Sequence, residues 1–415
     1  MLKPTAPGRY PGQSSGSSLP TIGATDHASL EEILGQALHT VRMHLKMEFA
    51  FISEFQGGVR IFRYVDGQDG PLPLCVGASD PLEESYCQRI VDGRLPELIP
   101  NAGRLAEALT LPVTLSFPVG AHLSVPIRFS DGRLYGTFCC FSTKPNDNLN
   151  EHNLATLRLF AAFAGHLLER HVMSRKAHEV KTARITSVIA EQAFRIVYQP
   201  IIHVVQSRVV GYEALARFTT EPLRSPDRWL DDAAQVGLQQ QLEIALIKEA
   251  LKGLDHFPVD CYVSLNVSPE TILSGAVANT LANFPLKRIM LEVTEHELVT
   301  DYALIARTLE PLRQQGLLLA VDDAGAGYAS FRHILKLKPD VIKLDSSLIH
   351  NIDSNNDCRA LAAALIRFGE ETGSRIVAEG VETEGELAML RQLKVNKAQG
   401  YLLGIPAPLE DYRFT

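Results

Sequence analysis

The sequence predicts an α/β protein with two unlike folded parts, an α+β domain followed by a TIM-type (β/α)₈ barrel. Three observations predict this division. The chain has 415 residues, and at roughly 100 to 200 residues per domain we expect two or three domains. The first part reads as antiparallel hairpins, whereas from about residue 195 short apolar runs alternate with helical stretches, as in parallel βα units. A long helical pattern connects the two parts.

The composition is that of an ordinary globular protein. Hydrophobic residues make up 46% and charged residues 21%, which disfavours long disordered regions and a disulfide scaffold. A formal net charge of −8 argues against binding a nucleic acid polymer. The six cysteines have no CxxC spacing and favour reduced thiols in a cytoplasmic protein. No apolar stretch reaches the roughly 18 residues of a membrane span.

The N-terminal part begins with a tail and continues as an α+β domain. Residues 1–26 are rich in Pro, Gly and Ser and predict a flexible tail. Residues 27–150 predict an antiparallel sheet with flanking helices, because period-two runs are separated by glycine-containing turns. The expected elements are a helix from Leu30, strands at Glu48–Phe55 and Val59–Tyr64, and a hairpin that turns at Ser130-Asp131-Gly132.

Residues 151–194 connect the two parts and contain no proline and no glycine except Gly165. One helix of about 40 residues would be roughly 60 Å long and could not bury its own surface. Two interpretations stay open: two or three helices broken by turns, or one helix that pairs with its copy in a homodimer.

Residues 195–415 predict the barrel. Seven or eight βα units in about 220 residues fit a closed barrel better than an open sheet. The expected strands lie in RIVYQPII, VVGYEALARF, CYVSLNVS, IMLEVTE, LLLAVDDAG, VIKLD, RIVAEGVE and AQGYLLG, and the expected helices are Leu230–Leu254, Asp301–Gln315 and Arg359–Thr372.

Several of these strands end in a carboxylate or an amide. Buried carboxylates are costly unless they are paired or hold a cation, and the ends of parallel barrel strands meet at one rim. Oxygen ligands favour hard ions such as Mg²⁺, Mn²⁺ or Ca²⁺. One such residue is usually a cap or a surface ion pair, but six successive units indicate a site. The residues are Glu213, Asn266, Glu292, Asp322, Asp323, Asp345 and Glu379.

The same runs resemble the motifs of EAL domains, the cyclic-di-GMP phosphodiesterases. VVGYEALARF contains the signature, and the other motifs follow in family order over about 220 residues: YQPI from Tyr198, SLNVSP around Asn266, LEVTE from Leu291, DDAGAGYAS from Asp322, KLD from Lys343, AEGVE from Ala378 and QGYLLG from Gln399. The resemblance implies hydrolysis of cyclic-di-GMP to linear pGpG with two divalent ions, Mg²⁺ or Mn²⁺.

The resemblance also implies a role for each matching residue. The implied ligands are Glu213, Asn266, Glu292 and Asp322 for one ion and Asp322, Asp323 and Glu379 for the other. The implied catalytic set is Lys343, which orients or activates the attacking water, with Glu379, Asp323, Glu213 and Glu295, the last steadying the loop after Asp323. The implied substrate-facing residues are Gln199, Leu215, Arg217, Glu382 and Gln399.

Two places depart from the family pattern. Ala324 stands where the family usually has phenylalanine, so the loop at residues 325–330 lacks an aromatic anchor. Ser347 and Leu348 stand where the family often has a basic residue and phenylalanine. Neither departure removes an implied metal ligand.

Residues 27–150 resemble a GAF domain, a small-molecule and dimerisation module. The resemblance lies in SYCQRIVDGRLPELIPNA at 85–102 and AHLSVPIRFSDGRLYGTFCCFS at 121–142. It implies the fold but leaves the ligand unknown, and a domain that only dimerises stays an alternative. For Cys87 a buried core thiol is favoured over chromophore attachment, and for His122 a core histidine is favoured over a haem ligand.

Two functions stay open for the whole chain. One is a cyclic-di-GMP phosphodiesterase regulated by the GAF-like domain, and the other is a catalytically inactive cyclic-di-GMP sensor. The complete acidic set favours the enzyme. The sequence has no GGDEF-type stretch and no adjacent His-Asp pair, which argues against a cyclase and against the other phosphodiesterase class. A scaffold without a ligand would not explain the acidic strand ends.

Overall fold

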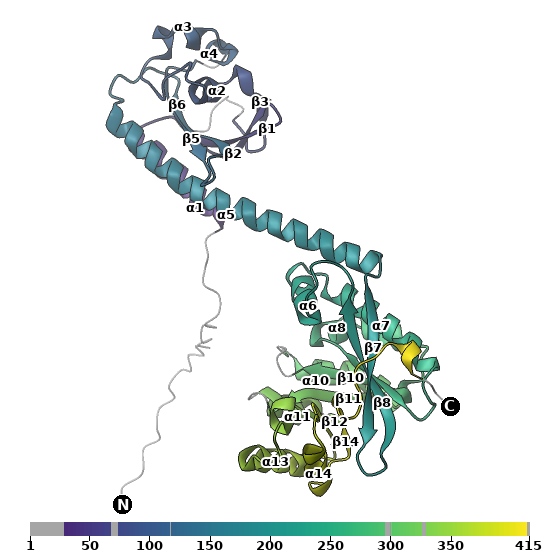
Figure 1. Cartoon of the computed structure of the whole chain (residues 1–415). Coiled ribbons are helices and arrows are strands. Elements are labelled where there is room, and N and C mark those ends of the chain that lie inside the picture. Colours follow the sequence, from purple (N-terminus) through teal and green to yellow (C-terminus); the bar gives the residue numbers. More distant parts are fainter. Residues whose placement is uncertain are drawn as a thin grey trace, which may run out of the picture. The chain divides into compact units, whose positions relative to one another are not determined.

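A computed structural model describes residues 29–67, 74–116, 118–294, 299, 301–325 and 329–412. The described part of the chain divides into two compact units, with the boundary between Arg175 and Lys176 (Figure 1). The expected flexible tail lies outside the described residues. One unbroken helix, α5 (Glu151–Ala190, 40 residues), runs through the division of the chain. The alternative of two or three shorter helices in this segment is therefore wrong.

The N-terminal unit is a six-stranded antiparallel sheet in the order β3-β2-β1-β6-β5-β4. The expected helix, both expected strands and the expected hairpin are present. The strands are β1 (Phe49–Gln56), β2 (Val59–Gly67), β3 (Ser79–Pro81), β4 (Leu98–Ile99), β5 (Ala121–Arg128) and β6 (Leu134–Ser142). The helices are α1 (Leu30–Leu45), α2 (Tyr86–Val91), α3 (Ala106–Leu109) and α4 (Pro112–Ser116).

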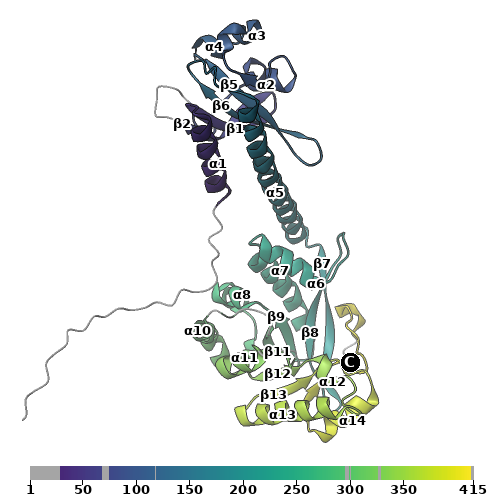
Figure 2. The ribbon, with the colours of Figure 1, turned by 90° about the vertical axis from the view of Figure 1, so that its left-hand side faces the viewer.

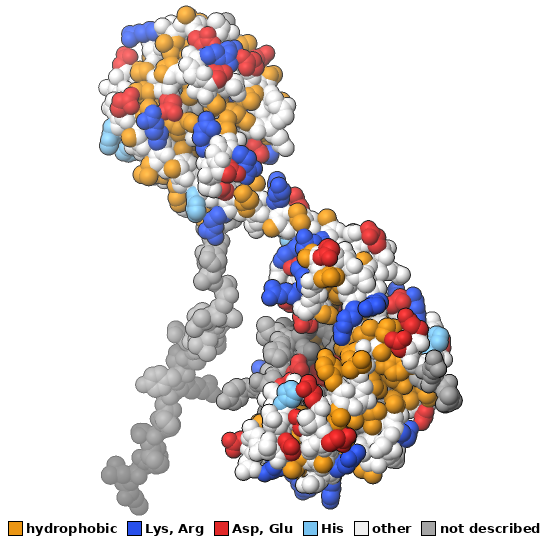
Figure 3. Space-filling view, viewed as in Figure 1, with side chains coloured by type: hydrophobic (Ala, Val, Ile, Leu, Met, Phe, Trp, Pro, Cys, Tyr) orange, Lys and Arg blue, Asp and Glu red, His pale blue; other side chains and the backbone are white. Residues whose placement is uncertain are grey.

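Two hydrophobic cores cover the two faces of this sheet. On one face, residues of α1 and the first half of α5 pack against β5 and β6, with Leu38, Leu157 and Phe138 fully buried. On the other face, aromatic residues of β1, β2 and β6 pack against α2 and the segment around α3. Acidic and basic side chains are interspersed on the face of this unit drawn in Figure 3.

The C-terminal unit is a closed eight-stranded barrel, in the order β10-β11-β12-β13-β14-β7-β8-β9. This confirms the predicted fold class. The strands are β7 (Phe194–His203), β8 (Arg208–Phe218), β9 (Tyr262–Asn266), β10 (Ile289–Thr294), β11 (Leu318–Ala324), β12 (Val341–Leu344), β13 (Arg375–Ala378) and β14 (Lys397–Ala398). The helices are α6 (Pro226–Gln235), α7 (Gln239–Leu251), α8 (Pro269–Leu273), α9 (Ala276–Leu281), α10 (Tyr302–Gln314), α11 (Ala329–Leu337), α12 (Ser346–Ile349), α13 (Asn356–Thr372) and α14 (Glu384–Gln392), and Figure 2 shows this unit from a second side.

Two details differ from the sequence-based expectation. Strand β7 runs antiparallel to both β8 and β14, because the link to β8 is only residues 204–207 and a parallel crossover needs a dozen or more residues. The expected helix Leu230–Leu254 is two helices, α6 and α7. The chain turns between them at Gly237, whose φ of 70° suits glycine and interrupts a helix.

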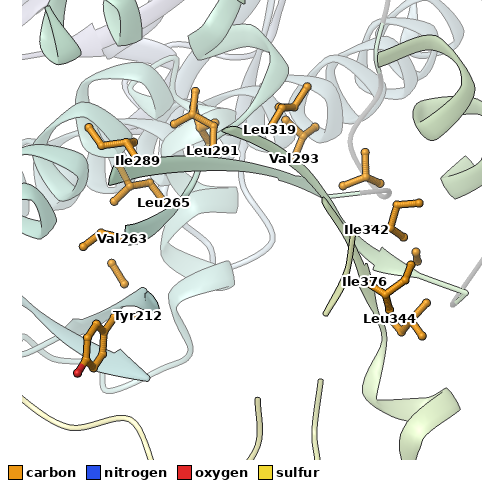
Figure 4. Packing of buried hydrophobic residues seen from close by; sticks show 14 of the residues in the cluster. Tyr212, Val263, Leu265, Ile289, Leu291, Val293, Leu319, Ile342, Leu344 and Ile376 are labelled. Atoms are coloured by element: carbon orange, nitrogen blue, oxygen red, sulfur yellow. The ribbon is translucent and has the colours of Figure 1, made fainter. Parts of the chain in front are cut away.

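Successive side chains of the barrel strands point alternately outward, toward the helices, and inward, into the barrel. Outward-facing residues such as Val263, Leu291 and Ile342 pack in the main core of this unit (Figure 4). A separate buried cluster contains the alternate residues Met290, Ala320, Val341 and Val377, together with Tyr262. Since successive side chains of a strand point to opposite faces, this second cluster fills the interior of the barrel.

Candidate active site

The polar residues of the candidate site follow from the same alternation. Two residues beyond the interior residues Met290, Ala320, Val341 and Val377 come Glu292, Asp322, Lys343 and Glu379. Residues two apart on a strand share a face, so these charged side chains occupy the next interior layer toward the carboxyl ends of the strands. This is the end of a barrel at which βα loops build active sites.

Lys343 lies at the centre of this layer and is fully buried. Its Nζ is 2.6 Å from Glu379 Oε1 and 2.8 Å from Glu292 Oε2. It is also 3.1 Å from Asp322 Oδ2 and 3.6 Å from Glu213 Oε2. One ammonium group therefore contacts four carboxylates that come from four different strands or strand ends.

Glu213 accepts hydrogen bonds from two amide side chains, and a third amide side chain extends this network. Asn266 Nδ2 donates to Glu213 Oε1 over 3.3 Å, and Gln399 Nε2 donates to Glu213 Oε2 over 2.6 Å. Gln399 Nε2 also donates to Gln199 Oε1 over 2.8 Å, and Gln199 Nε2 donates to the backbone oxygen of Gly404 over 3.0 Å. Three residues implied as ligand or substrate contacts thus form one hydrogen-bonded chain with Glu213.

Asp322 and Asp323 present carboxylates to one cluster although they are neighbours on β11. The pairing of β11 with β12 shifts register between Val321 and Ala324, and Asp323 has a left-handed φ of 55°. A β-bulge of this kind changes the direction in which a side chain points, here that of Asp323. A carboxylate oxygen of Asp322, one of Asp323 and one of Glu379 lie within 4.8 Å of one another, as do those of Glu213, Glu292 and Asp322.

The electrostatics of the cluster are unbalanced toward negative charge. Burial alone would lower the pKa of Lys343, but the surrounding carboxylates raise it well above its ordinary value. Burial raises the pKa of Glu379 well above its ordinary value, with Lys343 opposing the shift and the other carboxylates adding to it. Burial likewise raises the pKa of Glu292. For Glu213, the charge of Lys343 and the amide hydrogen bonds outweigh burial and lower the pKa.

The donor set fits hard divalent cations. Four carboxylates share one ammonium group, three of them buried and that of Glu379 half-buried, so the cluster has more negative charge than Lys343 can neutralise. Its oxygens form two groups that share Asp322, as an arrangement for two neighbouring ions requires. Carboxylate and amide oxygens are ligands that Mg²⁺ and Mn²⁺ prefer.

A cavity of about 750 Å³ opens beside this cluster. Its lining includes five residues of the sequence-based site: Leu215, Arg217, Asn266, Asp322 and Asp323. Arg217 is half-buried, and its Nη1 donates to the backbone oxygen of Ala216 over 2.7 Å. The cavity therefore combines apolar walls and the guanidinium group of Arg217 with the acidic cluster.

Asp345, which the sequence singled out, has a different role from the cluster around Lys343. Asp345 caps the N-terminus of α12, where its side chain accepts from the backbone N–H of Ser347, so the ordinary explanation of a strand-end cap is right for this residue. Glu382 is exposed, and its Oε1 lies 4.0 Å from His350 Nε2. Glu295 lies outside the described residues, and so do residues 326–328 of the loop that follows Ala324.

The sequence-based site missed Ser264. Its hydroxyl group donates a short hydrogen bond to Glu292 Oε1, and the residue is fully buried. Ser264 precedes Asn266 by two positions on β9 and therefore faces the same interior. The alternation of side chains along β9 could have predicted that Ser264 faces the interior, whereas comparison with the family motifs could not.

The family comparison agrees with this geometry. Residues 182–406, more than half of the chain, match the family model of the EAL domain. This chain belongs to the EAL domain family. Residues 27–169 match the family model of the GAF domain, so the EAL domain follows a GAF domain.

Several curated proteins are similar to this chain over part of its length. The probable cyclic di-GMP phosphodiesterase PdeD of Escherichia coli is 29% identical over 233 residues, which are 54% of this chain and 43% of PdeD. The cyclic di-GMP phosphodiesterase NbdA of Pseudomonas aeruginosa is 29% identical over 253 residues, 58% of this chain and 32% of NbdA. An uncharacterized signaling protein of Caulobacter vibrioides is 27% identical over 341 residues, 79% of this chain and 41% of that protein. The chain thus spans less than half the length of these relatives.

Solved structures share the fold of the EAL domain. A structure described as PaMucR phosphodiesterase in complex with c-di-GMP has a TM-score of 0.51 and 29% identity, and the match covers 56% of this chain and 98% of that chain. The EAL enzyme Bd1971 with cAMP and cyclic-di-GMP bound has a TM-score of 0.54 at 18% identity, covering 88% of this chain and 92% of that chain. The second likeness concerns the fold alone.

Proposed function

We propose that this protein hydrolyses cyclic-di-GMP to linear pGpG in a reaction that depends on divalent metal ions. The observation that carries the proposal is the complete acidic cluster around Lys343, which opens onto a cavity lined by Leu215 and Arg217. Relatives with the same domain, PdeD and NbdA, are described as phosphodiesterases of this dinucleotide.

Two groups of residues would hold the ions, which we take to be Mg²⁺ or Mn²⁺. They are Glu213, Asn266, Glu292 and Asp322 for the first and Asp322, Asp323 and Glu379 for the second. Two such ions supply charge neutralisation at the phosphate and lower the pKa of a water molecule. An acidic rim would otherwise repel a substrate with two anionic phosphates.

The chain's own residues position these groups. Lys343 keeps the carboxylates of Glu292, Asp322 and Glu379 within one small volume. The amides of Gln399 and Asn266 fix both oxygens of Glu213. Arg217 would hydrogen-bond phosphate oxygens with its forked guanidinium, and Leu215 would contact an apolar face of the nucleotide. We also keep Glu382 as a proposed substrate contact and Glu295 as a proposed support of the loop after Asp323.

The test is product formation together with binding. Purified full-length protein, cyclic-di-GMP and Mg²⁺ or Mn²⁺ should yield pGpG, measured by chromatography. Glu213→Gln should abolish turnover because it removes a ligand charge. Asp345→Asn is the matched control: it follows a strand in the same way but caps α12, and asparagine also caps helices well, so turnover should be unchanged. Tight binding without any turnover in either metal would favour the sensor over the enzyme.

We further propose that the GAF domain regulates the EAL domain through a homodimer formed along α5. Positions 159, 163, 166, 170, 173, 177 and 180 follow the alternating three- and four-residue spacing of a coiled-coil seam. Four large apolar side chains on this seam are exposed in the single chain: Leu159 (69%), Phe163 (48%), Met173 (45%) and Val180 (49%). A second copy of α5 would bury them.

We also propose that the protein is located in the cytoplasm. All six cysteines are free, which supports a reducing compartment and hence the cytoplasm. None of the helices in the described part of the chain is both long and apolar enough to cross a membrane.

A further inference from the structure

The N-terminal unit contains a cavity of its own, with a volume of about 220 Å³. Three phenylalanines from three strands of the sheet form part of its wall: Phe51 of β1, Phe62 of β2 and Phe141 of β6. Val113 and Val119 line it as well. Flat aromatic walls of this kind favour a planar apolar molecule.

One polar ring in the wall is buried, and one of its nitrogens has no hydrogen-bond partner among the described residues. His122 is 3% exposed, its ring stacks on Tyr86 with centroids 4.8 Å apart, and it lines the cavity. Within the described part of the chain its Nδ1 has no hydrogen-bond partner. Burial, aided by the charge of Arg60, lowers the pKa of His122 to about 3. The imidazole is therefore neutral at physiological pH and has one donor and one acceptor.

Arg60, which lines the cavity, already has partners. Arg60 Nε donates to Asp80 Oδ1 over 3.0 Å, and its Nη2 forms an ion pair with the same carboxylate. Its Nη1 donates to Cys87 Sγ over 3.0 Å. An anionic ligand such as a cyclic nucleotide would therefore have to compete with Asp80 for this guanidinium group, whereas a neutral ligand would not.

We propose that this cavity binds a small, neutral, planar heteroaromatic molecule of one or two rings. The phenylalanine walls contact its faces, and the imidazole of His122 hydrogen-bonds a polar atom on its edge. The size fits, because an engineered protein cavity of about 150 Å³ binds benzene. This site is independent of the cyclic-di-GMP chemistry proposed for the barrel.

Isothermal titration calorimetry of the full-length protein with three probes tests the proposal. The probes are 1H-indazole, which is neutral and bicyclic with one donor and one acceptor, indene, which has the same shape without polar atoms, and 3′,5′-cyclic GMP, which is anionic. We expect 1:1 binding of indazole, with indene weaker by about 5- to 30-fold for the lost hydrogen bond, and no binding of cyclic GMP. Absence of indazole binding, or tighter binding of cyclic GMP, would overturn the proposal.

Three variants assign the binding to this cavity. His122→Phe keeps a flat ring and removes both nitrogens, so indazole should bind no better than indene does. Ala78→Trp places an indole in the lining and should abolish binding of both. His39→Phe alters an exposed histidine of the same unit (side chain 59% exposed) and should change nothing. Thermal denaturation confirms that each variant is folded, and folded variants that bind indazole as the wild type does would also overturn the proposal.

Discussion

At the scale of single residues, the central feature is the ratio of four carboxylates to one lysine. Lys343 is the only basic group among the described residues that contacts Glu213, Glu292, Asp322 and Glu379 together. Removing one partner of a buried ion pair leaves uncompensated charge in a low-dielectric interior. The lysine should therefore stabilise the metal-free fold.

Lys343→Met should lower the free energy of unfolding of the metal-free protein by about 3–5 kcal/mol. The measurement is chemical denaturation in the presence of a chelator. Lys336→Met is the control, because Lys336 is exposed on α11 and its replacement should have an effect within about 0.5 kcal/mol. Equal stability of the two variants would show that the four carboxylates do not depend on Lys343 for compensation.

At the scale of elements, the alternation of side chains along a strand explains which residues of the site the sequence could predict. Glu292, Asp322 and Glu379 each follow an apolar run and face the barrel interior, so it was predictable that their side chains lie close together. Asp345 also ends such a run, yet β12 stops at Leu344 and the residue caps the next helix. The sequence motifs alone did not reveal that Ser264 hydrogen-bonds Glu292. They also did not reveal the β-bulge that turns the side chain of Asp323. Both features depend on how neighbouring strands pair.

The opposite end of the barrel interior contains a second buried lysine, which was also not predicted. Lys397 Nζ donates to Tyr262 Oη over 3.1 Å and lies 4.3 Å from the centre of that ring. Burial, with the nearby charge of Arg375, lowers the pKa of Lys397 from 10.5 to about 8. An ammonium group with this depressed pKa destabilises the fold wherever it is charged.

The pH dependence of stability should reveal this lysine. Below pH 8 Lys397 is charged in both states and its full burial cost is present; between pH 8 and about 10.5 the unfolded state binds more protons, so the folded state gains stability as pH rises. Relative to Lys397→Met, the free energy of unfolding of the wild type should therefore rise over that range, by at most about 1.4 kcal/mol per pH unit. Parallel profiles of the two proteins would contradict the depressed pKa.

At the scale of the whole molecule, α5 connects the two compact units. Its first half packs in the core of the N-terminal unit through Leu154, Leu157 and Leu168, and its end packs in the C-terminal unit through Ile185 and Val188. The sequence predicted the helical character of this segment but could not decide between one helix and several. The regulation proposed above would act along this unbroken helix of 40 residues.

Phe163→Glu should convert a dimer into a monomer, because it places a charge in the proposed seam. Sedimentation velocity measures the change, and turnover measured on the same samples should change with it. His171→Glu introduces the same charge at an exposed residue off the seam and should leave the dimer intact. A wild-type protein that is monomeric at all concentrations, or a Phe163→Glu variant that stays dimeric, would contradict the proposed dimer.

The most direct test of the proposed activity is mass spectrometry of the product formed in ¹⁸O-labelled water. In the proposed reaction a water oxygen bonds to phosphorus, the P–O3′ bond breaks, and the leaving oxygen becomes a free 3′-hydroxyl group. The account predicts pGpG with one heavy oxygen in its 5′-phosphate, formed by the wild type with Mg²⁺ or Mn²⁺ and not by Glu213→Gln. Unlabelled product, or intact cyclic-di-GMP with both metals, would contradict it.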